Sequence, residues 1–290
     1  MVWLSTRGRL AVMMIPGLIV FTGLIVYPVL YSLWYSFTDF QGFGDPEFVG
    51  FDNYIGLMND PFFWIALQNT LIILVVSMVV LIPASFGLAL LLQKAIPGTG
   101  LMRALVFAPA IIAPILVGLI WVFILDPRLG ILDRLLKSLG MPADVALIGG
   151  DVLTPYSVAL VFIWSSVGFA MTIFYAGLQL LPQDVMEASE LDGATGWQRI
   201  RYIIVPMMRE SFAIVSVLLI TNVFKIFELV YVLTSGGPVH RSEVLVSYMY
   251  FTTFTNLQYG PGMAIAVIVT LLGAVVSIVY LFLIRERKSA

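Results

Sequence analysis

Long apolar runs separated by shorter polar segments make up most of this chain. A run needs about 20 residues to cross ~30 Å of hydrocarbon as a helix, and six runs reach that length. They are Leu10–Phe37, Ile65–Leu92, Ala104–Leu125, Pro155–Leu180, Ser211–Val232 and Met263–Ile284. No internal repeat or linker separates them. The pattern therefore predicts an all-α membrane protein in which six transmembrane helices form one domain over residues 1–290.

The composition agrees with a membrane location. Of the 290 residues, 60% are hydrophobic and 11% are charged, whereas about a quarter of the residues of a soluble domain are charged. The absence of cysteine excludes disulfides and thiol chemistry. The single histidine, His240, argues against a histidine metal site or a Ser-His-Asp triad. The net charge of −2, without a long basic cluster, argues against nucleic acid as a partner.

The distribution of Lys and Arg predicts the orientation. If the N-terminus is cytoplasmic, ten of the 15 basic residues fall in cytoplasmic segments, four fall in outer segments, and Lys225 lies within a span. The first outer loop, Thr38–Trp64, holds five acidic residues and no basic one. By the positive-inside rule, both termini are expected in the cytoplasm. In the other outer loops, turn residues predict a short helix at Ile131–Leu139 and a stop at Ser235–Pro238.

The most charge-dense segment of the chain is the 182–206 loop, between the fourth and fifth runs. Pro182 suits the first position of a helix. The residues that then share one helical face, beside an acidic stripe, are Val185, Ala188 and Leu191. Asp192-Gly193 provides a break, because glycine accepts the left-handed conformation that ends a helix, and a second amphipathic piece follows at Trp197–Val205. A plain connector needs only a few residues, so this loop is predicted to be a docking surface.

The sequence EASELDGATGWQRIRYIIVP within this loop resembles the EAA loop of permease subunits from binding-protein-dependent ABC importers. Glu187, Ala188, Gly193 and Pro206 stand at the matching positions, and Ser189 replaces the usual second alanine. Further segments resemble the sugar-importer branch: FVGFDNY (48–54), FWIALQNT (63–70), GLIW (118–121) and FELVYVLTSGGP (227–238). The resemblance covers nearly the whole chain. It implies the type I importer permease fold, with a cytoplasmic coupling helix between spans four and five.

The resemblance also implies a mechanism. In such importers the EAA helix lies in a cleft of a cytoplasmic ATPase subunit and transmits its closure to the spans. The residues expected to couple this chain to the ATPase are Glu187, Ala188, Ser189, Asp192 and Gly193. Glu187 would be the acidic contact, Ala188 the close-packing position and Gly193 the turn between the two helical pieces.

The expected partners follow from the same resemblance. They are a second homologous permease subunit, two ATPase subunits, an extracytoplasmic solute-binding protein, a sugar substrate and the lipid bilayer of the plasma (inner) membrane. No phosphate-binding sequence of the type GxxxxGK[ST] occurs in the chain. ATP and magnesium are therefore expected in the partner ATPase, and this chain is expected to be no enzyme and to hold no cofactor or metal.

Polar residues within the fifth span are candidates for the substrate path, because such residues are costly in a membrane. Thr221, Lys225 and Glu228, at i, i+4 and i+7, would form one helical stripe, with Asn222 beside it. Thr221 and Asn222 fall near the midplane, where transporters tend to hold substrate. Lys225 can pair with Glu228, and a purely structural ion pair is the alternative interpretation of these two charges.

Other spans add weaker candidates. Trp164 and Ser166, with Ser165, could line the same path, or they could serve in helix packing. Asn69 could also line this path, or it could instead cap the start of the second span.

These observations predict the transmembrane subunit of an ATP-driven importer, which forms half of the pathway for a sugar or oligosaccharide. An importer of glycerol-phosphate-type solutes is an alternative. Such a substrate would favour an unpaired cationic lining, and Lys225, with a possible partner at Glu228, leaves the choice between the two substrates open. An ion-coupled secondary carrier would need no docking loop and would more often hold acidic residues at the midplane. An intramembrane enzyme is disfavoured, because His240 lies in an outer loop.

Overall fold

The computed structural model describes residues 7–93, 97–127, 130–139, 147–150, 152–237 and 240–286. Over these residues the chain is helical, apart from an isolated β-bridge between Thr38 and Phe48. The helices group into two units. One consists of Met1–Asp60 with Met249–Thr270, and the other of Pro61–Tyr248 with Leu271–Ala290.

The first unit contains the N-terminal span. Its elements are α1 (Arg7–Phe21), the π-helical η2 (Thr22–Val26), α2 (Tyr27–Tyr35), α3 (Asp52–Met58), η5 (Phe251–Thr255) and the first part of α15 (Tyr259–Glu286). α1, η2 and α2 run on as one apolar helix, as predicted. The side-chain amide of Asn53 donates to the carbonyls of Ser36 and Thr38 at 2.9 and 2.7 Å. The Gly260 N–H donates to the Phe40 carbonyl at 2.9 Å, so the loop after α2 is fixed to the beginning of α15.

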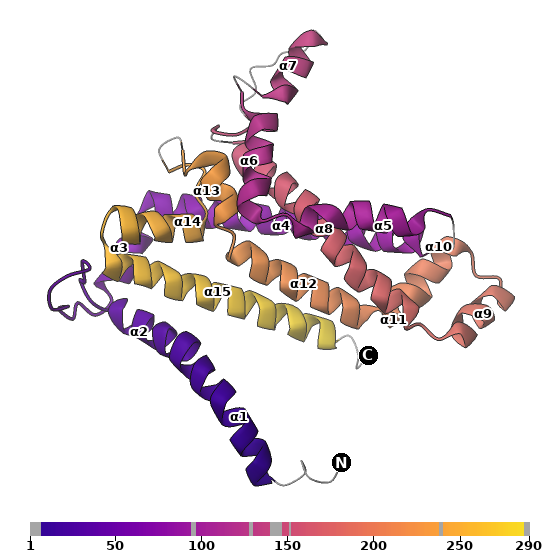
Figure 1. Cartoon of the computed structure of the whole chain (residues 1–290), viewed down its shortest axis with the longest axis horizontal. Coiled ribbons are helices and arrows are strands. Elements are labelled where there is room, and N and C mark those ends of the chain that lie inside the picture. The colour runs from indigo at the N-terminus through magenta and orange to yellow at the C-terminus, as the bar shows by residue number, and fades with distance from the viewer. Residues whose placement is uncertain are drawn as a thin grey trace. The chain divides into compact units, whose positions relative to one another are not determined.

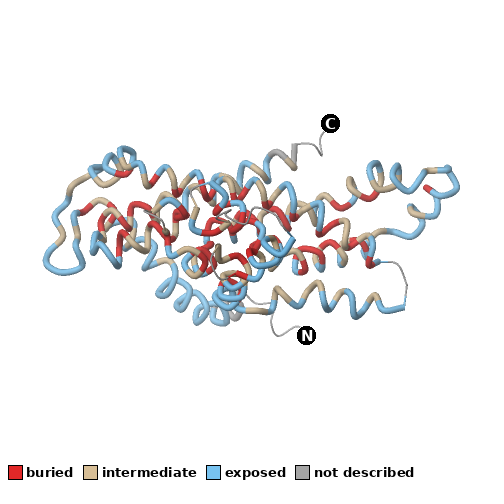
Figure 2. The backbone as a smooth tube through the Cα atoms, turned by 90° about the horizontal axis from the view of Figure 1, so that it is seen from above, coloured by how far each residue is buried: buried red, intermediate tan, exposed pale blue. Residues whose placement is uncertain are grey.

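The second unit is built around α4 (Pro61–Leu92), α8 (Thr154–Gln179) and α12 (Arg209–Phe224), shown in Figure 1. Phe86, Phe174 and Phe212, one from each helix, pack with ring centroids 4.7–5.5 Å apart. The hydroxyls of Ser216 and Tyr280 are hydrogen bonded at 2.6 Å, which ties the second part of α15 to α12. Buried and exposed residues alternate along these helices (Figure 2). Exposed positions such as Val75 and Val79 are apolar, as expected of a protein surrounded by lipid and partner spans.

The predicted third span is bent. α5 (Thr99–Phe107) and the 3-10 turn η3 (Ala108–Ile111) end at an extended pair, Ile112-Ala113, and α6 (Pro114–Leu125) then leaves at 98° (Figure 1). The span predicted over Ala104–Leu125 is therefore not one straight helix. The physical reason is Pro114: a residue that precedes proline is pushed out of the helical region, and Ala113 has a ψ of 136°.

The predicted fifth span is interrupted as well. α10 (Gly196–Arg199), the π-helical η4 (Ile200–Ile204) and α11 (Val205–Met207) form one helical piece that meets α12 at 70°. α12 ends at Phe224, and α13 (Glu228–Thr234) begins after a break. One continuous helix over Ser211–Val232 is thus also wrong. Counting each bent pair as one span, the described residues hold between four and six candidate spans.

Shorter elements complete the fold. α7 (Ile131–Ser138) confirms the short helix predicted there. α13 ends at Ser235 in the left-handed conformation, with a φ of 46°, which confirms the predicted stop; Pro238 lies outside the described residues. α3 and α14 (Leu245–Tyr250) are short helices that the hydropathy pattern does not predict.

Candidate functional site

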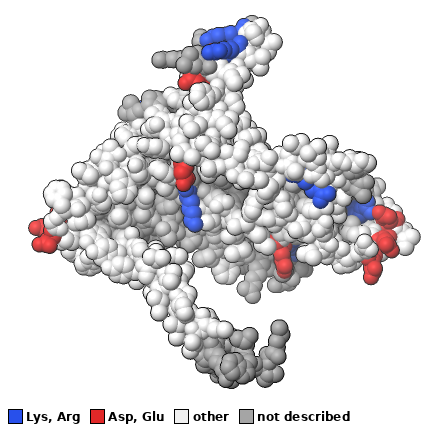
Figure 3. Space-filling model, viewed as in Figure 1, with Lys and Arg blue, Asp and Glu red and all other residues white. Residues whose placement is uncertain are grey.

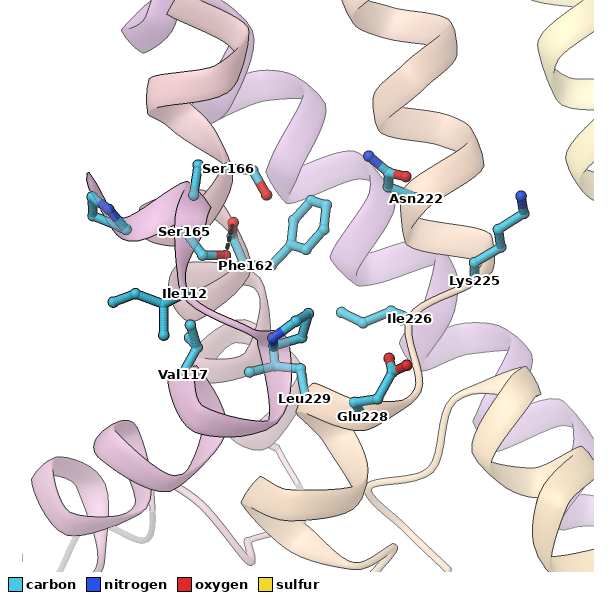
Figure 4. A pocket seen from close by; sticks show the side chains of 13 residues that line it. Ile112, Val117, Phe162, Ser165, Ser166, Asn222, Lys225, Ile226, Glu228 and Leu229 are labelled. Carbon is cyan, nitrogen blue, oxygen red and sulfur yellow. Dashed lines mark hydrogen bonds between the residues drawn. The ribbon is translucent and has the colours of Figure 1, made fainter. Parts of the chain in front are cut away.

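A cavity of about 430 Å³ lies where the two interrupted spans face α8 (Figure 4). Three stretches line it: the break between η3 and α6, the Phe162–Ser166 segment of α8, and the break between α12 and α13. Because helices end at both breaks, their backbone groups are not all used within helices. The cavity therefore combines apolar walls with polar groups, which is typical of a small-molecule site.

The structure brings four of the predicted path residues to this cavity. They are Ser166, Asn222, Lys225 and Glu228. Ser165 also lines it, and its hydroxyl donates to the Phe162 carbonyl at 3.0 Å. The sequence pattern misses the contribution of Pro109, Ile112 and Pro114, although the two prolines signal an interruption there.

The two charges of the cavity are separated by the break. Lys225 is the residue that follows α12, and Glu228 is the first residue of α13. The predicted continuous stripe from Thr221 to Glu228 is therefore wrong, and among the described residues no ion pair joins Lys225 to Glu228. In Figure 4 the Lys225 amine points away from the Glu228 carboxylate. Each charge instead suits its helix end, because cations are favoured at C-termini and anions at N-termini.

Three other predicted residues lie elsewhere. The Thr221 hydroxyl donates to the Val217 carbonyl at 2.8 Å, and Thr221 is not among the residues that line the cavity. Trp164 does not line it either; its ring meets Trp121 edge to face at 5.6 Å. Asn69 lies well inside α4 and donates to the carbonyls of Arg241 and Glu243 at 2.9 and 2.8 Å. The prediction that Asn69 caps the second span is therefore wrong. The Asn69 side chain instead fixes the chain before α14 to α4.

The 182–206 loop forms two helical pieces. α9 (Gln183–Leu191) begins one residue later than predicted, with Pro182 at the N-cap position. Gly193, after the C-cap Asp192, has a φ of 74°, which confirms the left-handed turn. Within α9 only Ser189 is buried, while Glu187, Ala188 and Leu191 are exposed. The apolar face of α9 thus remains uncovered in this chain.

Three interactions stabilise the turn between α9 and α10. Thr195 caps α10 in a capping box with Gln198: its hydroxyl accepts from the Gln198 N–H at 3.4 Å, and the Thr195 N–H donates to the Gln198 side chain at 2.9 Å. The Arg199 guanidinium is paired with the Glu190 carboxylate across the turn. The T-x-x-Q spacing signals the box, whereas the ion pair depends on the folding of the loop. Figure 3 shows acidic and basic groups gathered at this end of the unit.

These features define the class of protein. Interrupted helices that meet at a polar cavity are a construction that membrane transporters use, and an exposed two-helix loop offers a surface to a partner. No group of three or more possible metal ligands occurs among the described residues. The chain is a membrane-embedded transport component.

Comparison with known proteins gives the family. Residues 99–289 match the family described as "Binding-protein-dependent transport system inner membrane component". The chain belongs to this family. It is the permease component of a binding-protein-dependent ABC transporter and a multi-pass inner membrane protein, as the 182–206 loop predicts. The family also confirms the expected need for a binding protein and the expectation that the chain is not the catalytic component.

Two relatives illustrate the similarity. The chain is 30% identical over 278 residues to the trehalose transport system permease protein SugA of Mycobacterium tuberculosis (strain H37Rv), covering 95% of this chain and 88% of SugA. It is 30% identical over 281 residues to the sn-glycerol-3-phosphate transport system permease protein UgpA of Pectobacterium atrosepticum, covering 96% and 94%.

A solved structure supports the fold. A chain of a bacterial alginate ABC transporter, crystallised in complex with an alginate pentasaccharide-bound periplasmic protein, aligns with a TM-score of 0.81 at 21% identity. The alignment covers 93% of this chain and 92% of that one. It confirms the predicted all-helical permease fold.

Proposed function

We propose that this chain forms half of the translocation pathway of an ATP-driven importer for a sugar or oligosaccharide. The observation that carries this proposal is the cavity at the two interrupted spans. Its lining contains hydroxyl and amide groups, and its two charged side chains, Lys225 and Glu228, are of opposite sign. Such a lining offers donors and acceptors to hydroxyl groups without net charge. Relatives whose names refer to trehalose and to starch degradation products support this substrate class.

The 182–206 loop would receive the movement that drives transport. α9 exposes Glu187 and the apolar Leu191, and it buries only Ser189. An exposed amphipathic helix with an uncovered apolar face suits a groove on another protein. In the proposed complex the groove belongs to an ATPase subunit that holds ATP and magnesium. Two such subunits, a second permease and an extracytoplasmic binding protein complete the importer, and both termini of this chain face the cytoplasm.

An importer of glycerol-phosphate-type solutes is the second candidate. One observation favours it: Lys225 lines the cavity and forms no ion pair with Glu228 among the described residues, so its amine could meet an anion. The relative UgpA, named for sn-glycerol-3-phosphate, points the same way. Lys225→Met separates the two candidates, because it would abolish uptake of an anion and only weaken uptake of a neutral sugar.

Uptake into proteoliposomes tests the proposed pathway. The complete complex, supplied with its binding protein and ATP, would be tested with radiolabelled trehalose, maltose and glycerol-3-phosphate. Asn222→Leu should lower uptake of the transported sugar at least tenfold, because it removes an amide from the cavity. Thr221→Val, one residue away but outside the cavity, should retain most uptake. Equal loss in both variants, or no uptake of any sugar by the wild type, would refute the proposal.

The loop is tested by separating ATP hydrolysis from uptake. Glu187→Lys and Gly193→Asp should abolish stimulation of the ATPase by loaded binding protein while the complex remains inserted in the membrane. Gly196→Asp is the matched control, because it adds the same charge to the same loop at a glycine without a positive φ. Retained stimulation in both Glu187→Lys and Gly193→Asp would show that the docking assignment is wrong.

A further inference from the structure

A second polar cavity, of about 550 Å³, lies behind α9. Its walls come from the residue after α4, the last turns of α8, the first turn of α9 and η4. Since Ser189 is the only buried residue of α9, this helix packs on the rest of the second unit over a small area. The cavity occupies the space where such packing would otherwise lie. Its volume falls within the range of about 300–1,000 Å³ that is typical of small-molecule sites.

Three exposed glutamines from three parts of the chain line this cavity. Gln93 follows α4, Gln179 ends α8 and Gln183 begins α9. None of the three side chains takes part in a hydrogen bond within the described residues. A glutamine amide supplies two donors and one acceptor oxygen, which matches hydroxyl groups that both donate and accept. The three amides together therefore suit a ligand with several hydroxyl groups.

The remaining lining favours an uncharged ligand. The phenol of Tyr175 lines the cavity, and apart from the three glutamines its other described lining residues are aliphatic or methionine. No Lys, Arg, Asp or Glu is among the lining residues that the structure describes. The nearby guanidinium of Arg103 is already engaged: it lies over the Tyr175 ring at 4.5 Å and donates from Nε to the Thr99 carbonyl at 3.3 Å. A cation over an aromatic face is attracted by the negative face of the ring. This contact holds the Tyr175 ring in place at the cavity.

We propose that this cavity binds a neutral polyhydroxylated molecule of mono- or disaccharide size and that binding inhibits transport. The ligand class is that of the proposed substrate, and this inference rests on the proposed function. A sugar released into the cytoplasm would enter the cavity and fill the space between α9, α8 and η4. It would then hold α9 against the spans and oppose the movement that the ATPase imposes on the loop. The importer would thus be slowed by its own accumulated product.

The test combines labelling with uptake. The complete complex in nanodiscs would be treated with a diazirine derivative of trehalose or maltose, irradiated, and digested for mass spectrometry. Label is expected on the Tyr175–Met186 segment, and free sugar should compete for it. Gln93→Ala combined with Gln179→Ala should reduce this label at least tenfold. Gln68→Ala, an exposed glutamine of α4 that lies outside the cavity, should leave it unchanged.

The uptake arm uses proteoliposomes loaded with the same sugar. Internal sugar should slow initial uptake several-fold in the wild type and in Gln68→Ala, but not in the double glutamine variant. Equal inhibition in all three would overturn the proposal, because the inhibition would then arise elsewhere. Label confined to the cavity around Asn222, or label on the Tyr175–Met186 segment only after the ATPase subunits are removed, would overturn it as well. Normal uptake that is not inhibited by sugar inside the proteoliposomes refutes this inference alone. Specific label on the Tyr175–Met186 segment without any sugar uptake refutes the proposed function.

Discussion

Gly168 is the position at which a single methyl group should distort the cavity. It lies on α8 two residues after Ser166, where α8 crosses the end of α5. A Cβ added to Gly168 would lie 2.7 Å from the Phe107 Cα and closer still to the Val106 carbonyl oxygen. Both obstacles are backbone atoms, so they cannot be relieved by a side-chain rotation. Gly168→Ala must therefore push α5 away from α8 or strain both.

A matched glycine gives the magnitude. Gly87, in α4, has no heavy atom within 4 Å of an added Cβ. Ala is preferred over Gly inside a helix by roughly 0.5–1 kcal/mol, and this gain applies to both substitutions. The difference in the free energy of unfolding between Gly168→Ala and Gly87→Ala is then the overpacking cost alone, which is about 1–3 kcal/mol. Thermal unfolding of the purified complex measures it: Gly87→Ala should match or exceed the wild type, and Gly168→Ala should unfold at a clearly lower temperature.

A third glycine distinguishes backbone from side-chain obstruction. An added Cβ at Gly177 would collide with the Ser211 hydroxyl. Gly177→Ala should therefore be destabilising alone and largely restored by Ser211→Ala, whereas no neighbouring truncation should restore Gly168→Ala. Equal thermal stability of Gly168→Ala and Gly87→Ala would refute the assigned crossing of α5 and α8.

Two further substitutions probe the 182–206 loop and the N-terminal part of α4. Thr195→Ala removes the N-cap of α10, which is worth about 1 kcal/mol, so amide hydrogen exchange at Gln198 should become roughly fivefold faster by local opening. The control Thr195→Ser should leave this exchange rate unchanged. Unaltered exchange in Thr195→Ala would argue against the capping box. Asn69→Ala removes the amide that donates to the Arg241 and Glu243 carbonyls. Loss of a buried hydrogen-bond partner costs about 1–3 kcal/mol, so this substitution should lower the unfolding temperature of the complex, whereas the neighbouring Gln68→Ala should not.

Local signals predict the loop better than they predict the cavity. Gly193 lies after an amphipathic helix, and the left-handed turn there follows from the conformational freedom of glycine. The capping residues Thr195 and Gln198 are likewise three positions apart. By contrast, the pair between Glu190 and Arg199 forms because α9 and α10 fold back on each other. That contact depends on tertiary structure, and no spacing rule identifies it.

The two interrupted spans differ in how far they can be predicted. Pro109 and Pro114 mark the first interruption, but prolines are tolerated within membrane helices, so the residues alone do not give a bend of 98°. The second interruption, at Lys225–Phe227, contains neither proline nor glycine. The apolar pattern continues through this interruption, so the sequence gives no signal of it. The expected helical stripe from Thr221 to Glu228 is wrong because the helix stops between them. Convergence of Ser166 and Asn222 then depends on how α8 and α12 pack.

The proposed ATPase-docking loop (182–206) and the cavity lined by Asn222 lie at opposite ends of α12. α12 begins at the 70° bend that follows the 182–206 loop, and it ends at Phe224, directly before Lys225 in the cavity lining. Its 16 residues give a length of about 24 Å at 1.5 Å per residue. Along that length it is held by Phe212 against Phe86 and Phe174, and by Ser216 against Tyr280. A helix packed in this way moves as a rigid body more readily than it bends. Displacement of α10 and α11 by the proposed ATPase contact would therefore appear at Lys225 and at the break before Glu228. At that break the N–H groups of Lys225 and Ile226 donate to the Asn222 and Val223 carbonyls at 3.2 Å. Because no helix continues through Lys225–Phe227, the cavity can change shape there without bending a continuous helix.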